Sequence, residues 1–503
     1  MIGLHNISAH LLDIPVTVRR IREVLDRTGY TESCIQQLLD VEELPMYPQR
    51  WQTLPLYLWR ARGESRLQIL VRLFLLQQSI SLDEVRHVIE PTDIEDWVEV
   101  GLLHVNGCDV MATVELCPYG SLVVAADWSD ETQPNLHQVM GIAASSRTLA
   151  QAIIPCHSHV TLDLGTGCGI LALLAAAHSE QVVAVDSNPR ALRMARFNAL
   201  LNGTTDIEFL EGNLFEPVRG RQFDLIVCNP PFVIAPQQIY LHSHSGMPLD
   251  RLCETIVRTA PVFMRQGGYC QLLCNWVQLA GADWRARLET WFDGSGCDAW
   301  ILHSHSEEVA DYASNRISNL APVAAQREKQ FNTWMDYYER ERVEAIGFGL
   351  VTMRRSNRSS KWFRCESWPE MVGPCGDAIE RGFVARNFLE DHGDRDLLET
   401  RVRHAPNLQW RQDHDISDLG TAVHSSLHFT SGLAYTAKMD SAIVKFVSRC
   451  AGDRPLSEYL RETAAISGED VCQFSPRFVK VVRRLIELGF LLPVQRPTHQ
   501  PES

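Results

Sequence analysis

The chain lacks several features that would place it outside ordinary globular proteins. No stretch of its 503 residues reaches the roughly 18 consecutive apolar residues that a membrane-spanning helix needs. Residues 1–13 have neither the basic start nor the apolar middle of a signal peptide, so we expect a cytoplasmic protein with no membrane partner. The 14 cysteines include no Cys-x-x-Cys pair and lie mostly in apolar runs. We therefore expect reduced thiols and predict no metal site.

Positive charge is also scarce. The chain holds 47 Lys and Arg against 62 Asp and Glu, a formal net charge of −15 at pH 7. This balance argues against a protein that coats nucleic acid nonspecifically, because such binding depends on neutralising phosphates. Residues 354–364 form a local exception, with five cations and two aromatic residues. We interpret this basic-aromatic segment as a solvated loop after a strand, and nucleic-acid contact is the alternative.

The length predicts two or three domains. In residues 1–140 we expect helices at 67–75, after Ser81 and near Thr92, followed by β-runs at 102–105 and 110–116. Three helices and a hairpin indicate a winged-helix-like module. Residues 1–150 contain 11 Arg and Lys against 20 Asp and Glu, so a protein-contact role is as well supported as a nucleic-acid role.

The middle of the chain, residues 141–366, alternates between strand and helix patterns. Such alternation predicts an α/β domain with a doubly wound parallel sheet. A charged helix over 326–344 precedes the last strand, which we expect to close the sheet in the antiparallel direction. Seven strands are expected, with helices between the first six: 160–164, 181–185, 207–211, 225–228, 269–274, 299–303 and 348–353.

Residues 367–503 form the third predicted domain. We expect loops to about residue 435, then helices at 442–450, 455–464 and 476–488, which make a second winged-helix-like module. The last residues, 496–503, are expected to be disordered.

A glycine-rich turn follows the first strand of the middle domain. Asp163, Gly165, Gly167 and Gly169 stand in the order acid-x-Gly-x-Gly-x-Gly, directly before a helix. Glycines let the backbone approach a ligand closely at a helix N-terminus. Dinucleotide-binding turns need glycine where Ile170 stands, so the spacing favours a ligand without a pyrophosphate.

Polar residues also follow the next two strands. Asp186 ends the second strand, where a carboxylate can accept both ribose hydroxyls, and the alternative role is to cap the next helix. Asn213, followed by Leu214, comes after the third strand, where an adenine amino group could be recognised. The alternative for Asn213 is a turn residue.

The run Asn229, Pro230, Pro231 and Phe232 stops the fourth strand. Neither proline has an N–H to donate, and each fixes its φ near −65°. The result is a rigid loop at the carboxyl end of a buried strand, which is where open α/β sheets bind ligands.

Together the glycine turn, Asp186 and the Asn-Pro-Pro-Phe loop resemble class I S-adenosylmethionine-dependent methyltransferases. More narrowly, they resemble the Asn-Pro-Pro-aromatic group that methylates nitrogen, including the "methyltransferase small" and release-factor glutamine enzymes. Two positions depart from the pattern: Asn213 stands where Asp is common, and residues 141–149 lack the proline- and glutamate-containing signature of the glutamine enzymes.

The resemblance implies a Rossmann-like core, S-adenosylmethionine as cofactor, and a catalytic role for Asn229, Pro230, Pro231 and Phe232. The implied cofactor residues are Asp163, Gly165, Gly167, Gly169, Asp186, Asn213 and Leu214. Acceptors at Asn229 and Pro230 would draw a planar nitrogen toward a pyramidal state, and Phe232 would stack on the acceptor.

The acceptor itself stays open at this point. We favour an exocyclic amine of an RNA base, because of the two winged-helix-like flanks and the basic-aromatic segment. The alternatives are a protein glutamine, which the acidic charge favours, and a noncatalytic cofactor sensor. The chain also contains two His-Ser-His runs, at 242–244 and 303–305, and the first could touch substrate. The sequence does not indicate an oligomeric state.

Overall fold

The computed structural model describes residues 11–44, 52–128, 135–237, 241–317, 324–414 and 422–494. The chain divides into two compact units. The first comprises residues 1–150 and 156–368, and the second comprises residues 151–155 and 369–503. Within the first unit, a domain boundary near residue 140 stays a prediction. No helix among the described residues is long and apolar enough to cross a membrane.

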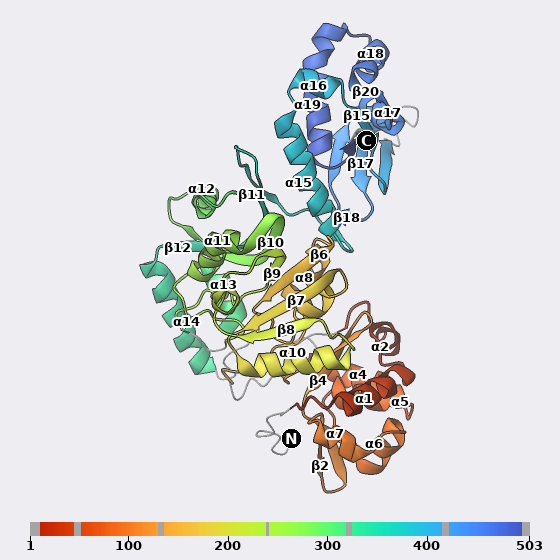
Figure 1. Cartoon of the computed structure of the whole chain (residues 1–503), viewed down its shortest axis with the longest axis vertical. Helices are drawn as coiled ribbons and strands as arrows, with labels where there is room; N and C mark the ends of the chain where they lie inside the picture. The colour runs from red at the N-terminus through yellow and green to blue at the C-terminus, as the bar shows by residue number, and fades with distance from the viewer. Residues whose placement is uncertain are drawn as a thin grey trace, which may run out of the picture. The chain divides into compact units, whose positions relative to one another are not determined.

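An eight-stranded sheet forms the centre of the first unit, in the order β13-β11-β12-β10-β9-β6-β7-β8 (Figure 1). Strands β6 to β10 run parallel, and β12 runs antiparallel to both β10 and β11. The α/β prediction and the antiparallel closing strand are therefore confirmed. The strands are β6 (Ser158–Leu164), β7 (Ser179–Asp186), β8 (Ile207–Glu211), β9 (Phe223–Cys228), β10 (Met264–Leu279), β11 (Cys297–Glu308), β12 (Val343–Arg355) and β13 (Phe363–Ser367).

The sheet has one strand more than the seven expected. The additional strand, β13, comes from the end of the basic-aromatic segment and pairs with β11 in the parallel direction. Phe363 packs against the hydrophobic core beside Phe292, with ring centroids 5.6 Å apart. Phe363 and Cys365 do alternate with polar residues, but the strand is only five residues long and follows directly on a basic segment that was interpreted as a loop.

Helices connect the strands on both sides of the sheet: α9 (Ile170–Ala175), α10 (Pro189–Leu201), α11 (Arg251–Phe263) and α12 (Trp284–Glu289). The prediction of a helix between β8 and β9 is wrong, because that connection holds only a 3₁₀ turn at Glu216–Val218. The connection is short, and Gly212 and Gly220 both take positive φ angles there.

Two helices between β11 and β12, α13 (Val309–Ile317) and α14 (Ala324–Arg340), hold the loop that follows the Asn-Pro-Pro-Phe run. The Tyr312 hydroxyl accepts the Ile234 N–H at 3.0 Å, and the Tyr338 hydroxyl donates to the Ile234 carbonyl at 2.7 Å. The Tyr337 hydroxyl accepts the Leu249 N–H at 3.0 Å. These helices therefore fix both ends of that loop through its backbone.

The N-terminal part of the first unit contains the expected winged-helix-like arrangement. Ser81 caps α6 by accepting the Glu84 N–H at 3.3 Å, and β2 and β3 form the predicted hairpin, with β1 added as a third strand. The expected run at 110–116 is split between β3 and β4, and β4 pairs with β5. The elements are α1 (Pro15–Arg27), α2 (Glu32–Leu39), α4 (Leu54–Arg60), α5 (Arg66–Phe74), β1 (Ile80–Ser81), α6 (Leu82–Ile89), α7 (Ile94–Glu99), β2 (Leu103–Asn106), β3 (Asp109–Ala112), β4 (Glu115–Tyr119) and β5 (Leu122–Ala126), followed by α8 (Ala144–Ala152).

The second unit is more regular than the sequence indicated. The expectation of loops up to residue 435 is wrong, because a 16-residue helix, α15, occupies Gly376–Asp391 and β-strands follow it. The third tail helix, α19, begins at Val471 rather than at Pro476, since the Asp470 carboxylate accepts the Cys472 N–H and starts it earlier. Residues 496–503, where disorder was expected, lie outside the described residues.

The remaining elements of the second unit are β14 (Met371–Val372), α16 (Asp394–Leu398), β15 (Arg401–His404), β16 (Leu408–His414), β17 (Ala422–Phe429), β18 (Gly432–Leu433), β19 (Thr436–Met439), α17 (Ser441–Arg449), β20 (Ala451–Pro455), α18 (Leu456–Ser467) and β21 (Leu491–Pro493). Helices α17, α18 and α19 share one apolar core. The strands β20, β15 and β21 form a small sheet, which completes a winged-helix-like arrangement.

Candidate active site

A cavity of about 670 Å³ lies at the carboxyl ends of β6, β7, β8 and β9. Nine of the eleven predicted site residues line it: Gly165, Gly167, Asp186, Asn213, Leu214, Asn229, Pro230, Pro231 and Phe232. The other two, Asp163 and Gly169, lie behind the lining. Parallel strands with crossover helices bring their carboxyl ends to one edge, and this explains why residues far apart in sequence meet here.

Backbone conformation accounts for two of the glycines. Gly167 has a φ of 55°, a conformation that glycine adopts without steric cost, and its N–H points to Asp186. Gly169 has a φ of 88°, and a Cβ there would lie 3.0 Å from the Cβ of Ala195 on α10. A larger residue at 169 would thus push the turn away from α10.

Asp186 closes the glycine turn. One carboxylate oxygen accepts the Gly167 N–H at 2.9 Å, and the other accepts the Asn188 N–H at 2.8 Å. Asn188, not Asp186, caps α10 through the Arg190 N–H. A carboxylate can accept about four hydrogen bonds, so acceptor capacity remains for a ligand hydroxyl. Burial raises the pKa of Asp186, and the backbone N–H donors oppose that shift.

Asp163 is completely buried below the turn. Its Oδ2 accepts the Thr166 hydroxyl at 2.7 Å, and its Oδ1 has no hydrogen-bond partner among the described residues. Burial raises the pKa of Asp163 to about 7. Asp163 therefore steadies the glycine turn from beneath the cavity through its bond to Thr166.

Asn213 and Leu214 lie at the far end of the cavity. Asn213 is exposed, and its carbonyl accepts the Glu216 N–H at 3.1 Å, so its backbone takes part in a turn while its side chain lines the cavity. Leu214 has a φ of 48°. Both of the alternatives for Asn213, turn residue and ligand contact, fit this position.

The side chain of Asn229 is held in one orientation. Its Nδ2 donates to the Ser145 hydroxyl at 3.1 Å and to the Ser146 hydroxyl at 3.2 Å, both at the start of α8. Its Oδ1 is buried and has no partner among the described residues. The amide is therefore fixed by its donor end, and its acceptor end is left for another molecule.

Several lining residues were not identified from the sequence. Ser145 and Ser146 belong to no motif, and Arg316 comes from α13. The Arg316 guanidinium lies 3.6 Å from the Tyr312 ring centroid and donates to Glu307 at 3.0 Å. The first His-Ser-His run does line the cavity, and its His244 forms a bridge with Phe232. The second run lies on β11 outside the cavity.

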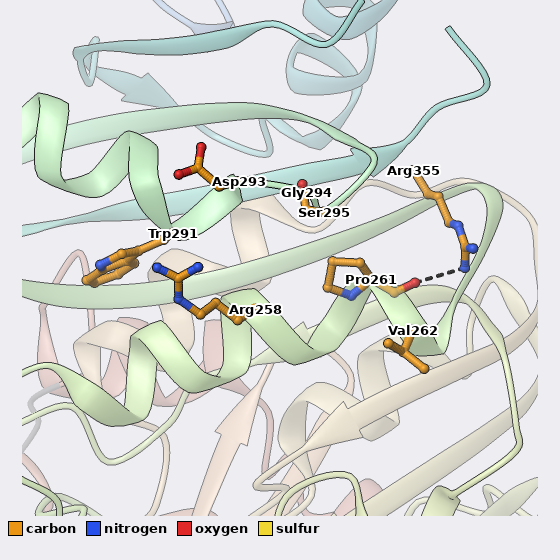
Figure 2. Close-up of a pocket in the computed structure, with 8 residues that line it drawn as sticks. All are labelled: Arg258, Pro261, Val262, Trp291, Asp293, Gly294, Ser295 and Arg355. Atoms are coloured by element: carbon orange, nitrogen blue, oxygen red, sulfur yellow. Dashed lines mark hydrogen bonds between the residues drawn. The ribbon is translucent and has the colours of Figure 1, made fainter. Parts of the chain in front are cut away.

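A second hollow of about 390 Å³ lies elsewhere in the first unit (Figure 2). Arg355 there donates to the Pro261 carbonyl at 2.8 Å, and Arg258 bonds Glu254 at 2.9 Å. This hollow contains none of the predicted site residues, so we assign the candidate active site to the larger cavity.

The basic-aromatic segment is packed rather than solvated. Arg355 bonds two backbone carbonyls, Lys361 donates to the Ser356 carbonyl at 2.8 Å, and Arg364 bonds Glu366 at 2.6 Å. Arg354 lies over the Tyr269 ring, and Trp362 is buried. These partners hold the side chains against the chain, and Arg364 is paired with a carboxylate, so the segment is less free to reach a nucleic acid than a solvated loop would be.

Comparisons with known proteins support the resemblance. Residues 131–284 match the family model of the methyltransferase small domain. Residues 27–113 and 380–493 match two models described as domains of unknown function, DUF7059 and DUF7782.

Curated relatives carry names for two kinds of substrate. The release factor glutamine methyltransferase of Xylella fastidiosa is 32% identical over 166 residues, which cover 29% of this chain and 58% of that protein. A putative protein N5-glutamine methyltransferase of Methanocaldococcus jannaschii is 29% identical, with coverage of 26% and 69%. The ribosomal RNA small subunit methyltransferase C of Cronobacter sakazakii is 29% identical, with coverage of 30% and 41%. The chain thus spans less than two thirds of the length of the Xylella relative.

Among solved structures, YcgJ of Bacillus subtilis aligns with 42% of this chain and 99% of its own, at a TM-score of 0.30 and 15% identity. A putative methyltransferase of Bacillus halodurans gives a TM-score of 0.29 and 16% identity, with coverage of 42% and 99%. TM-scores this low add no weight to the assignment. The sequence motifs meet in one cavity, and the family model matches the part of the chain that carries them. Residues 131–284 belong to the class I S-adenosylmethionine-dependent methyltransferases of the Asn-Pro-Pro-aromatic type.

Proposed function

We propose that this protein transfers a methyl group to a planar nitrogen that carries a hydrogen, and that Asn229 receives that hydrogen. The observation that carries the proposal is the fixed amide of Asn229. Ser145 and Ser146 occupy its Nδ2, and its buried Oδ1 lacks a partner among the described residues. A buried acceptor without a partner costs about 1–3 kcal/mol, and a substrate N–H would remove that cost.

The cavity residues fit S-adenosylmethionine. Glycine at 165 and 167 leaves open space where a Cβ would stand, and Asp186 keeps acceptor capacity for a ribose hydroxyl. Asp163 supports the glycine turn from below through Thr166. When bound, the cofactor supplies a methyl group on a sulfonium.

The side chains around Asn229 would prepare the acceptor nitrogen. An amide or exocyclic amine is a poor nucleophile because its lone pair is delocalised. Acceptance of its N–H groups by Asn229 Oδ1 and the Pro230 carbonyl would draw the nitrogen toward a pyramidal state. Phe232 lines the same cavity and can stack on the flat group. The nitrogen can lose its proton after transfer, so catalysis here depends on orientation more than on a base.

We infer that the acceptor is a protein glutamine. Two of the curated relatives described above are named for glutamine, and the chain carries a formal charge of −15. The packing of the basic-aromatic segment weakens one of the two reasons that favoured an RNA base. A flat carboxamide could donate its N–H groups to Asn229 Oδ1 and the Pro230 carbonyl and stack on Phe232.

An RNA base amine is the second candidate. Its support is the Cronobacter relative, which is named for ribosomal RNA, and the winged-helix-like flanks, an arrangement found in many nucleic-acid-binding modules. An exocyclic amine would meet Asn229 and Phe232 as a carboxamide does.

The test is transfer of radioactive methyl from S-adenosylmethionine to a cell extract. Aliquots are treated with RNase, DNase or protease and compared. We expect the labelled material to be destroyed by protease only. Loss with RNase only would replace glutamine by an RNA base, and binding of cofactor without any transfer would support a noncatalytic sensor instead.

A further inference from the structure

Three polar side chains converge at the amino ends of β6 and β7, the end of the sheet opposite the candidate active site. His157 precedes β6, His159 is its second residue, and Glu180 is the second residue of β7. Ser158 pairs with Ser179 in the parallel ladder. Since side chains alternate along a strand, His157, His159 and Glu180 must all lie on the face opposite those serines.

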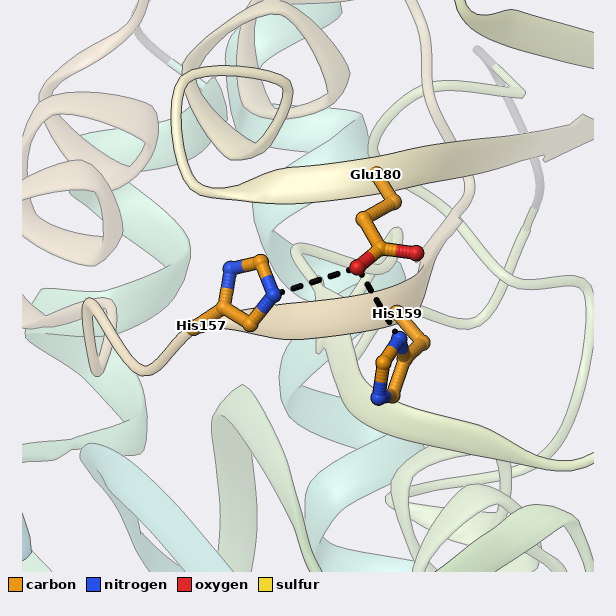
Figure 3. A group of neighbouring side chains, drawn as sticks. All are labelled: His157, His159 and Glu180. Carbon is orange, nitrogen blue, oxygen red and sulfur yellow. Dashed lines mark hydrogen bonds and ion pairs between the residues drawn. The ribbon is translucent and has the colours of Figure 1, made fainter.

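The distances confirm this convergence (Figure 3). Nε2 of His157 lies 3.2 Å and Nδ1 of His159 lies 3.1 Å from the same oxygen of Glu180. All three ligand atoms lie within 4.8 Å of one another. Ligands bound tetrahedrally at about 2.0–2.2 Å from a zinc ion are separated by roughly 3.3–3.6 Å. Small side-chain rotations would therefore bring the three atoms into coordination range.

Contact among these three side chains adds little to the stability of the fold. Their exposed fractions are 71%, 64% and 56%, and ion pairs that exposed contribute little to stability. The nearby carboxylate of Asp224 is already used, because it accepts the His159 and Val160 N–H groups and bonds Arg265. The His-Glu group is thus accessible from solvent and supported by a rigid backbone.

We propose that His157, His159 and Glu180 bind a divalent transition metal ion. Two imidazole nitrogens and one carboxylate oxygen suit Zn²⁺, Co²⁺, Ni²⁺ or Cu²⁺ better than Mg²⁺ or Ca²⁺, which prefer oxygen ligands. Water would complete the coordination. The ion would join the starts of β6 and β7, and its binding to the folded state would raise the melting temperature of the domain.

The proposal is tested by titrating full-length protein without a polyhistidine tag with Zn²⁺, by calorimetry, and with Co²⁺, by visible absorption. We expect one saturable equivalent, and an affinity at least about tenfold weaker in His159→Ala and in Glu180→Gln. The control is His87→Ala, which removes an exposed histidine of α6 outside the His-Glu group. This variant should bind the metal with the affinity of the native protein. The melting temperature should rise with Zn²⁺ in the native protein and in His87→Ala only.

The proposal would be overturned if the native protein showed no saturable binding, or if His159→Ala and Glu180→Gln bound the metal as tightly as the native protein. Because the three side chains are exposed, the variants should fold, and circular dichroism without metal checks this.

Discussion

The hydroxyls of Ser145 and Ser146 hold Asn229, and this leads to a first prediction. Ser145→Ala with Ser146→Ala would free the amide to turn, which would present Nδ2 instead of Oδ1 to the substrate. We expect turnover to fall by about five- to thirtyfold, since the loss of one or both hydrogen bonds costs about 1 kcal/mol each and about 1.4 kcal/mol is tenfold. Cofactor affinity should not change. Ser145→Thr with Ser146→Thr keeps both hydroxyls and serves as the control; equal loss in both double variants would contradict the positioning role.

Asp163 leads to a prediction about pH. Its ordinary pKa is 3.8, and burial raises it to about 7 in the folded protein. Between these values the folded state holds a proton that the unfolded chain has lost, so the contribution of Asp163 to stability falls as pH rises and levels off above about pH 7. Without cofactor, raising the pH from about 5.5 to about 7.5 should lower the melting temperature of the native protein relative to Asp163→Asn. A constant difference between the two proteins would show that the carboxyl does not titrate in this range.

The site residues that belong to sequence motifs could be predicted from the sequence. The residues that act by holding a neighbouring side chain could not. The glycine turn, Asp186 and the Asn-Pro-Pro-Phe run follow strand ends, so their meeting at one edge follows from the fold. Ser145 lies 84 residues before Asn229, and no pattern links them. The same holds for His157 and Glu180, because only the register of β6 and β7 brings them together.

The turn between β6 and α9 leads to a prediction at the level of the secondary-structure element. Gly169→Ala adds a Cβ at 3.0 Å from Ala195, in a backbone conformation with a φ of 88°. We expect a loss of stability of about 1–2 kcal/mol from the conformation alone, with weakened cofactor binding as the turn moves from α10. Gly203→Ala is a matched control: its φ is 68° and nothing lies within 4 Å of its Cβ. If both variants lost cofactor affinity equally, contact with α10 would not be the cause.

Elements with strong periodicity were predicted well, and those that depend on tertiary contacts were not. β9 and the middle of β10, residues 269–274, read as apolar runs because they are buried on both faces, but β10 itself extends from Met264 to Leu279. β13 forms because β11 offers it an edge, and α15 was missed although it is 16 residues long. Its apolar positions do not follow one face, so the pattern that indicates a surface helix is weak.

For the whole molecule, the negative charge and the packed cations predict a weak dependence on salt. Enzymes that neutralise 6–10 phosphates lose about 10³–10⁵ in affinity between about 50 and 200 mM salt. If the acceptor is a protein glutamine, kcat/KM for methyl transfer should change by less than about tenfold over that range. A decline of about a thousandfold or more would indicate that phosphates are bound and would favour the RNA acceptor.

The central claim is that Asn229 receives the substrate's N–H, and the most direct test compares Asn229→Ala with the native protein. Cofactor affinity is measured by calorimetry and turnover by methyl transfer to the acceptor fraction. We predict that the affinity stays nearly unchanged while turnover falls by about 100-fold or more, the cost of removing one preorganised hydrogen-bonding group. Unchanged turnover, or an equal loss of affinity and turnover, would contradict a substrate-facing role for Asn229.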